Sequence, residues 1–288
     1  MIKVRKQCEY NFYEYAAAVL LAKHAGKVDS PCTTLDEIAS VSPDCIESAH
    51  SADYILAMGS VNKRYANQWI QRFNLELAKH PFPDIQKVYL CGKYELPDIK
   101  VLNQHLHRAD KKGDIYIQTT KEFVAFSIKQ TTSCTKTNWS VERMIPGDLK
   151  RTRLQYLNES GFTTFQKSER TQVNRLFYGE NPYFTLLRTQ IETHRPTLLN
   201  EFKHSLYGFG LPYPLYEFDS KSLKCLNGTP ITHMSMEEYH AHYWTKKGNK
   251  KSTAKLFYRL KMNEDTYRIE VRWKGNVFVS PQFHTHME

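Results

Sequence analysis

Two short stretches near the middle of the chain alternate apolar residues with other residue types. They cover residues 115–117 and 123–129, and a polar Lys-Glu pair at 121–122 separates them. A period of two is typical of strands with one buried face, and a short polar turn between two such stretches is typical of a hairpin. The pattern therefore predicts an antiparallel hairpin over residues 113–130.

The hairpin brings three polar residues into one neighbourhood. Residues two apart share a face of a strand, so Ser127 and Lys129 are expected to point the same way, while Phe126 and Ile128 point to the opposite side. Asp114 stands at the start of the first strand, and we expect it to face Lys129 across the hairpin.

Helical periodicity dominates the residues before the hairpin. Helices are predicted over residues 10–25, 34–42, 52–80 and 96–106, and a short buried strand over 87–92. Gly26 is expected to end the first helix and Gly59 to interrupt the third, while the Thr-Leu-Asp-Glu sequence at 34–37 is a capping box. We expect Asp98 to cap the last helix of this group.

The residues after the hairpin repeat both patterns. Helices are predicted from Trp139 and over 149–157, 169–178 and 183–193, a loop over 207–216, and an antiparallel meander over 256–262, 266–273 and 276–279. The expected fold class is α/β, with a mixed central β-sheet flanked by helices and a C-terminal antiparallel β meander. We place a domain boundary near residue 160, although a single elaborated domain fits the length of 288 residues as well.

Composition adds a preference for polyanionic partners. The chain has 40 Lys and Arg against 30 Asp and Glu, a net charge of +10, and 18 Tyr and 15 Phe. Cations interleaved with aromatic rings suit nucleic-acid binding as well as a core. The six cysteines form no CxxC pair, so reduced thiols are expected.

No apolar stretch is long enough to cross a membrane. The basic N-terminus and the apolar run at 16–22 imitate a signal peptide, but seven residues are too few for one. We therefore expect an intracellular, cytoplasmic and soluble protein with no membrane partner.

The polar residues of the hairpin suit metal-assisted hydrolysis of a phosphodiester. Carboxylates hold Mg²⁺ against a phosphate oxygen, and a lysine orients the attacking water and screens the developing charge. Asp114, twelve intervening residues and then Ser127-Ile128-Lys129 resemble the core motif of the PD-(D/E)xK nucleases, which include many type II restriction endonucleases.

The resemblance departs from the family pattern at Ser127, where an acid is usual. Some restriction enzymes of this family also carry a serine there and take the missing carboxylate from the helix that follows. By resemblance, Glu142 is the first candidate for this carboxylate, and Glu14, on the first predicted helix, is the second; both can contribute. Ser127 itself is expected to hold a water.

Contacts with DNA are expected at two polar segments. The loop after the hairpin offers Lys136, Thr137 and Asn138 as donors to the backbone beside the scissile bond. The strongest basic cluster without an acid lies between Trp244 and Lys261 and includes Lys246, Lys247, Lys250 and Lys251.

Three H-x-H pairs offer a competing metal site. They are His105/His107, His240/His242 and His284/His286, but structural or surface histidines explain them better than a metal site does. The chain contains no P-loop, dinucleotide-binding or nucleophile-elbow motif.

The resemblance thus implies a Mg²⁺-dependent, site-specific endonuclease for double-stranded DNA. Residues 1–160 would form the nuclease core and 161–288 the recognition region. Asp114 with Glu142 or Glu14 would hold the metal, and Lys129 would be the water-orienting base. The products would carry a 5′-phosphate and a 3′-hydroxyl, and a homodimer would cut both strands in a restriction-modification system. A non-catalytic basic nucleic-acid-binding protein, or a repair or recombination nuclease of the same superfamily, are the alternatives.

Overall fold

The computed structural model describes residues 11–92, 94–106, 113–132, 134–162, 181–239, 255–273 and 277–288. The chain divides into two compact units, and each unit contains two segments of the chain. Unit 1 comprises residues 1–134 and 207–229, and unit 2 comprises residues 135–206 and 230–288. The division therefore lies near residue 134 instead of near 160, and a later segment returns to unit 1.

Unit 1 is built around helix α1 (Phe12–His24), whose residues from Ala16 to Ala22 are all buried. The Asn11 side chain accepts the N–H of Tyr13 and so caps the helix. The helix ends before Gly26, which has a φ of 72°. Most side chains of α1 between Ala16 and Ala22 are small or aliphatic on all sides of the helix. The helix can therefore pack against the sheet and against neighbouring helices at the same time.

The remaining helices of unit 1 follow the predicted pattern closely. They are α2 (Leu35–Ser40), η1 (Pro43–Cys45), α3 (Ser51–Leu56), η2 (Ala57–Ser60), α4 (Lys63–Lys79) and α5 (Pro97–Leu102). The capping box of α2 is present, with Thr34 and Glu37 bonded reciprocally, and the helical run breaks around Gly59 as predicted. Asp98, however, is not a cap: it lies inside α5 and accepts a hydrogen bond from the Tyr89 hydroxyl.

The described residues of unit 1 form one five-stranded sheet in the order β1-β2-β3-β5-β6. The strands are β1 (Ile85–Leu90), β2 (Ile115–Thr119), β3 (Phe123–Ile128), β5 (Leu215–Phe218) and β6 (Leu223–Cys225). The predicted hairpin is present as β2 and β3, with Ile115 opposite Phe126. β5 runs parallel to β3 and the other neighbours are antiparallel, so the sheet is mixed.

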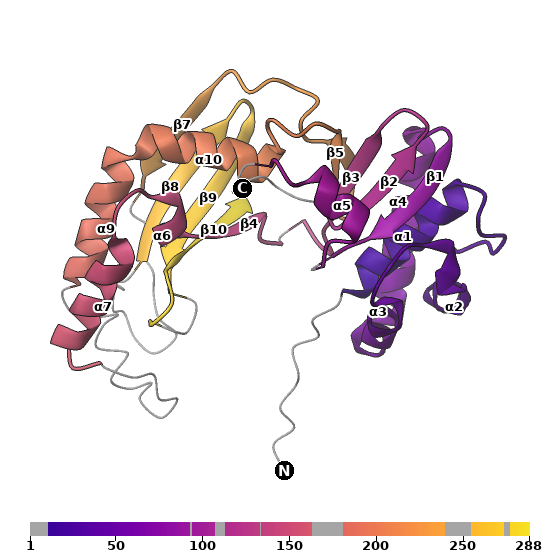
Figure 1. The fold of residues 1–288 in the computed structure, drawn as a ribbon, viewed down its shortest axis with the longest axis horizontal. Helices are drawn as coiled ribbons and strands as arrows, with labels where there is room; N and C mark the ends of the chain where they lie inside the picture. Colours follow the sequence, from indigo (N-terminus) through magenta and orange to yellow (C-terminus); the bar gives the residue numbers. More distant parts are fainter. Residues whose placement is uncertain are drawn as a thin grey trace, which may run out of the picture. The chain divides into compact units, whose positions relative to one another are not determined.

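Alternation along the strands separates two cores in unit 1. Phe126 and Ile128 face the core that contains α1, whereas Ala125 faces a smaller core with Tyr116 and Leu215. Figure 1 shows α1 and α4 on one side of this sheet. Helices therefore cover the α1 face of the sheet, and polar side chains are found at the ends of its strands.

Unit 2 contains an antiparallel sheet in the order β4-β10-β9-β8-β7 in the part of the chain that the structure describes. The strands are β4 (Thr137–Ser140), β7 (Met234–Glu238), β8 (Lys255–Met262), β9 (Asp265–Arg272) and β10 (Gln282–Met287). The expected C-terminal meander is confirmed, although its third strand lies at Gln282–Met287 instead of at 276–279. Trp139 belongs to β4 and not to a helix.

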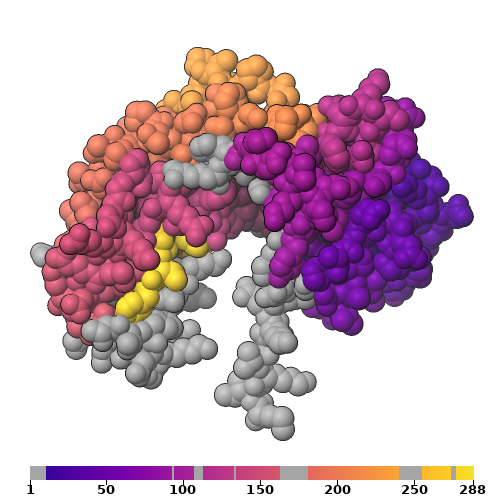
Figure 2. All heavy atoms as spheres, viewed as in Figure 1, coloured from indigo at the N-terminus to yellow at the C-terminus, as the bar shows by residue number. Residues whose placement is uncertain are grey.

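The helices described in unit 2 are α6 (Val141–Met144), α7 (Leu149–Glu159), α9 (Pro182–Thr193) and α10 (Arg195–Tyr207). In Figure 1, α9 and α10 lie along the sheet of unit 2, and Phe202 of α10 packs edge-on against Phe283 of β10. Within each unit, side chains fill the gaps between the ribbon elements (Figure 2). The helix predicted at 169–178 lies outside the described residues.

The expected fold class is thus confirmed as a mixed α/β fold with two sheets. The five cysteines in the described residues are free thiols. No helix in the described ranges combines the length and the apolar character needed to span a bilayer.

Candidate active site

Glu14 on α1 lies within electrostatic reach of Asp114 and Lys129. Burial, and next the negative charge of Asp114, raise the pKa of Glu14 to about 8. The charge of Lys129 and hydrogen bonds with Asn11 and Tyr54 act in the opposite direction. Three of the residues selected from the sequence therefore form one cluster, which we call the Glu14 cluster: Glu14, Asp114 and Lys129.

Asp114 is fixed to the neighbouring strands by both backbone and side chain. Its N–H donates to the Phe126 carbonyl at 2.7 Å, and its Oδ2 accepts the N–H of Ile128 at 2.7 Å. Its own carbonyl accepts the N–H groups of Cys91 and Gly92. The carboxylate is therefore held at the strand edge where β2 begins and β3 ends.

Gly92 leaves the space that the Glu14 carboxylate occupies. Its φ is 51°, and a Cβ at this position would lie 1.8 Å from the Tyr54 hydroxyl and 2.8 Å from Glu14 Oε2. A side chain at residue 92 is therefore excluded by the two groups that share a hydrogen bond, Tyr54 and Glu14. Burial, and next the negative charges of Glu14 and Asp114, raise the pKa of Tyr54, so its hydroxyl remains a donor.

Lys129 follows directly after β3 and is half-buried. Its N–H donates to the Phe218 carbonyl at 2.8 Å, and its carbonyl accepts the indole N–H of Trp69 at 3.3 Å. These bonds hold the backbone of Lys129 between β5 and α4. Ser127, two residues earlier, is 2% exposed and shares the strand face of Ala125.

Glu217 is a buried acid that the sequence patterns did not single out. It lies on β5 as the register partner of Ser127, and only 7% of it is exposed. Leu215, two residues earlier on β5, packs with Ala125, the register partner two residues before Ser127. Glu217 and Ser127 therefore project from the same face of the sheet. The four residues of β5 carry no clear alternation in the sequence, so no local pattern could have revealed Glu217.

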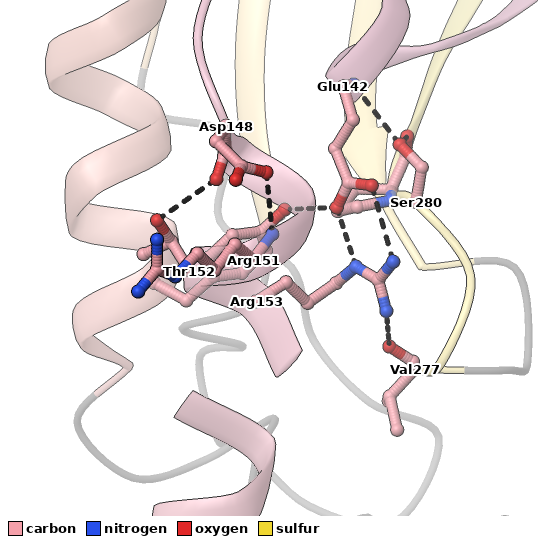
Figure 3. Close-up of polar contacts among 9 residues, drawn as sticks. Glu142, Asp148, Arg151, Thr152, Arg153, Val277 and Ser280 are labelled. Carbon is pink, nitrogen blue, oxygen red and sulfur yellow. Dashed lines mark hydrogen bonds and ion pairs between the residues drawn. The ribbon is translucent and has the colours of Figure 1, made fainter. Parts of the chain in front are cut away.

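Glu142 belongs to unit 2, where two other side chains donate hydrogen bonds to its carboxylate (Figure 3). Arg153 Nε lies 2.5 Å from Oε1 and Arg153 Nη2 lies 3.2 Å from Oε2, while the Tyr183 hydroxyl donates to Oε1 at 2.8 Å. Arg153 also donates to the Val277 carbonyl. Glu142 is thus a member of a buried ion pair between α6 and α7 of unit 2, whereas Asp114 belongs to unit 1.

The expected DNA donors after the hairpin are divided between buried and exposed positions. Lys136 and Thr137 are each 8% exposed, and the Thr137 hydroxyl donates to Thr285 Oγ1 across the sheet of unit 2. Asn138 is exposed. The basic residues Lys246, Lys247, Lys250 and Lys251 lie outside the described residues.

Side chains that bind metals do not gather into a large group. In the ranges that the structure describes, no three His, Cys, Asp or Glu side chains form a site that could hold a metal ion by themselves. Of the H-x-H pairs, His284 is buried in β10, and His107, His240 and His242 lie outside the described residues. A metal at the Glu14 cluster would therefore need ligands from the substrate or from water.

Tyr54 and Gly92 are the other residues of the site that sequence reasoning missed. Both act on Glu14 from segments with no motif of their own, and a glycine two residues after the end of β1 was the one local signal. Comparisons with protein-family models, curated proteins and solved structures found no match to this chain. The residues of the site therefore carry the functional argument alone.

Proposed function

We propose that this protein is a Mg²⁺-dependent endonuclease that hydrolyses phosphodiester bonds of double-stranded DNA. The observation that carries the proposal is the Glu14 cluster, in which two carboxyl groups and a lysine from three different segments meet where the inner strand β2 begins and its neighbour β3 ends. This combination is the one that metal-assisted phosphodiester hydrolysis requires.

The residues of the cluster fit a divalent cation. Burial, and next the negative charge of Asp114, oppose the ionisation of Glu14 and raise its pKa. A cation between the two carboxyl groups would offset that opposition. Mg²⁺ is usually held by one or two carboxylates, with water and substrate phosphate as its other ligands, so Glu14 and Asp114 suffice. Bound there, Mg²⁺ would polarise a phosphate oxygen and lower the pKa of a nearby water.

The chain's own groups supply orientation. The Ile128 N–H holds the Asp114 carboxylate, and the Tyr54 hydroxyl holds that of Glu14. The ammonium of Lys129 orients the attacking water and screens the charge that develops on the phosphate. Ser127 on β3 stands where the family pattern has an acid, and Glu217 is its register partner on the neighbouring strand β5.

The finer proposal is a type II restriction endonuclease. By resemblance, the products carry a 5′-phosphate and a 3′-hydroxyl, unit 2 contributes to sequence recognition, and a cytoplasmic homodimer cuts both strands of a two-fold symmetric site. A DNA-binding protein without catalysis is a weaker candidate. Two carboxyl groups facing DNA would repel its phosphates unless a cation lay between them.

The test is a digest of unmethylated plasmid and viral DNA by the purified protein, with Mg²⁺ or with EDTA. We expect discrete fragments in Mg²⁺ and none in EDTA. Asp114→Asn, Glu14→Gln and Lys129→Ala should each lower the cleavage rate by about a hundredfold or more, as loss of a group that stabilises the transition state does.

The matched control is Glu122→Gln, which removes an exposed carboxylate from the turn of the same hairpin and should cut normally. A smear with the same Mg²⁺ dependence would indicate a nuclease that reads DNA shape instead of a site-specific restriction enzyme. Intact DNA from several sources, with DNA still bound by the protein, would contradict the catalytic proposal.

A further inference from the structure

A cavity of about 860 Å³ opens beside the Glu14 cluster in unit 1. Its walls come from the start of α1, the start of α4, the preceding turn of η2 and the two residues after Lys129. A space of this size exceeds a water cluster and is within the range of small-ligand sites. The proposed chemistry does not use it.

Two long helices begin at this cavity. Asn11 caps α1 and Asn62 caps α4, which have 13 and 17 residues, and both caps line the cavity. The start of a helix carries a partial positive charge and unpaired backbone N–H groups. Two such starts at one cavity favour an anion.

The described residues that line the cavity include no Asp or Glu. Arg64 lines it from the first turn of α4, is exposed, and forms no ion pair with another described residue. Asn and Gln amides, hydroxyl groups and apolar side chains make up the rest. Among the described residues that line the cavity, the charged side chain is thus the cation Arg64.

Tyr13 provides an independent sign of a ligand. Its side chain is 2% exposed and lines the cavity, yet its hydroxyl has no hydrogen-bond partner among the described residues. Burial, and next the neighbouring Tyr65, raise the pKa of this hydroxyl to about 12 while Gln130 lowers it, so the hydroxyl keeps its proton and can donate. A buried hydroxyl without a partner costs free energy unless a ligand or water satisfies it.

The cavity is connected to the Glu14 cluster through the backbone and through shared side chains. Gln130, which follows Lys129, lines the cavity, and its carbonyl accepts the Tyr65 hydroxyl at 2.7 Å. Asn11 lines the cavity and also bonds to Glu14. An extended substrate at the cluster would therefore continue into the cavity.

We propose that this cavity binds a nucleotide unit of the DNA strand that is cut, with its phosphate against the starts of α1 and α4 and against Arg64. The proposal rests on the proposed nuclease function and adds a substrate-binding site to it. Tyr13 donates its hydroxyl to the bound strand, and the amides contact sugar or base edges.

The test measures binding of a fluorescent mixed-sequence DNA duplex by the 288-residue chain carrying Lys129→Ala, in which cutting is slowed. Adding Arg64→Ala should weaken binding about tenfold, the usual effect of losing a hydrogen bond to a charged group. It should also lower the slope of log Kd against log salt by about one, the value for one phosphate contact.

Arg72→Ala is the matched control, because Arg72 is exposed on α4 and does not line the cavity. It removes the same charge and should leave binding and salt slope nearly unchanged. Tyr13→Phe deletes only the hydroxyl and should weaken binding by about threefold to tenfold without lowering the melting temperature.

Equal binding by the Arg64→Ala and Arg72→Ala proteins, or full affinity after Tyr13→Phe, would overturn the proposal. Binding of thymidine monophosphate that needs Arg64, with DNA binding independent of it, would also overturn it in favour of a free nucleotide. Cleavage is measured separately: a protein that binds DNA through Arg64 and Tyr13 but never cuts supports this site and contradicts the nuclease proposal.

Discussion

Glu14 is an acid whose ionised form is destabilised by its surroundings. The pKa of a free glutamic acid is 4.5 and that of Glu14 is about 8. Between these pH values the folded chain keeps a proton that the unfolded chain has released. Stability that is fully present below pH 4.5 is therefore lost as the pH rises to about 8, by at most about 5 kcal/mol.

The first prediction follows from this sign. In EDTA at pH 8, Glu14→Gln should melt at a higher temperature than the unchanged protein, and below pH 4.5 the two should melt together. Mg²⁺ should raise the melting temperature of the unchanged protein at pH 8 and that of the variant much less. Thermal unfolding across this pH range checks it, with Glu122→Gln as a control that should follow the unchanged protein.

Gly92 gives a second prediction at the residue scale. Gly92→Ala would place a methyl group on the Tyr54 hydroxyl and against Glu14, in a backbone conformation that alanine disfavours. We expect a loss of about 1–3 kcal/mol of stability and a large loss of cleavage, because Glu14 must move.

The matched change is Gly59→Ala, since no atom lies within 4 Å of a Cβ built at Gly59. It should alter stability by no more than about 0.5 kcal/mol. Chemical denaturation and the plasmid digest measure both variants. Equal behaviour of the two would show that the Glu14 carboxylate does not depend on the space at Gly92.

At the scale of elements, the parallel pairing of β3 with β5 decides which acid lies beside Ser127. The pairing places Glu217 there, from a strand 90 residues further along the chain (217 − 127). We predict that Glu217→Gln lowers cleavage more than Glu122→Gln does, because it removes a buried carboxylate from the strand next to Lys129. Digestion kinetics of the two variants provide the comparison, and equal rates would assign Glu217 a structural role only.

The ion pair of Glu142 and Arg153 joins α6 to α7, and Tyr183 adds α9. Both charged side chains are under a tenth exposed. Glu142→Leu alone leaves the buried Arg153 charge without its carboxylate and should cost about 3–5 kcal/mol. Combining it with Arg153→Met should restore most of the stability, because no uncompensated charge then remains.

Activity of the double variant separates the two roles considered for Glu142. A structural ion pair predicts that the double variant, once stable, cuts DNA normally. If Glu142 were a metal ligand, the double variant would be stable and inactive. Urea denaturation and the plasmid digest, run on the single and double variants together, give the answer.

Local patterns predicted the elements whose signals are local. The hairpin of β2 and β3 follows from alternation around a polar turn, and the start of α2 follows from its capping box. β5 was hidden in a segment rich in glycine, proline and tyrosine, because its four residues are stabilised by pairing with a distant strand. Spacing also placed Glu142 close to Lys129 along the chain, but it could not show that a different unit begins at residue 135.

At the scale of the whole molecule, two units with separate sheets share one chain that passes between them more than once. The Glu14 cluster lies in unit 1, and the Glu142 ion pair lies in unit 2. A ligand that binds only folded unit 1 stabilises that unit by mass action, whereas a change confined to the core of unit 2 acts on the stability of unit 2.

This separation leads to a final prediction for calorimetric unfolding at pH 8. Two transitions are expected, since each unit has its own sheet and core. Mg²⁺ should raise the midpoint of one transition, and Glu142→Leu should lower the midpoint of the other. Glu14→Gln serves as the control, because it should abolish the Mg²⁺ shift and leave the response to Glu142→Leu intact. If Mg²⁺ and Glu142→Leu moved the same single transition, the units would unfold as one cooperative body, and the assignment of the two sites to independent units would fail.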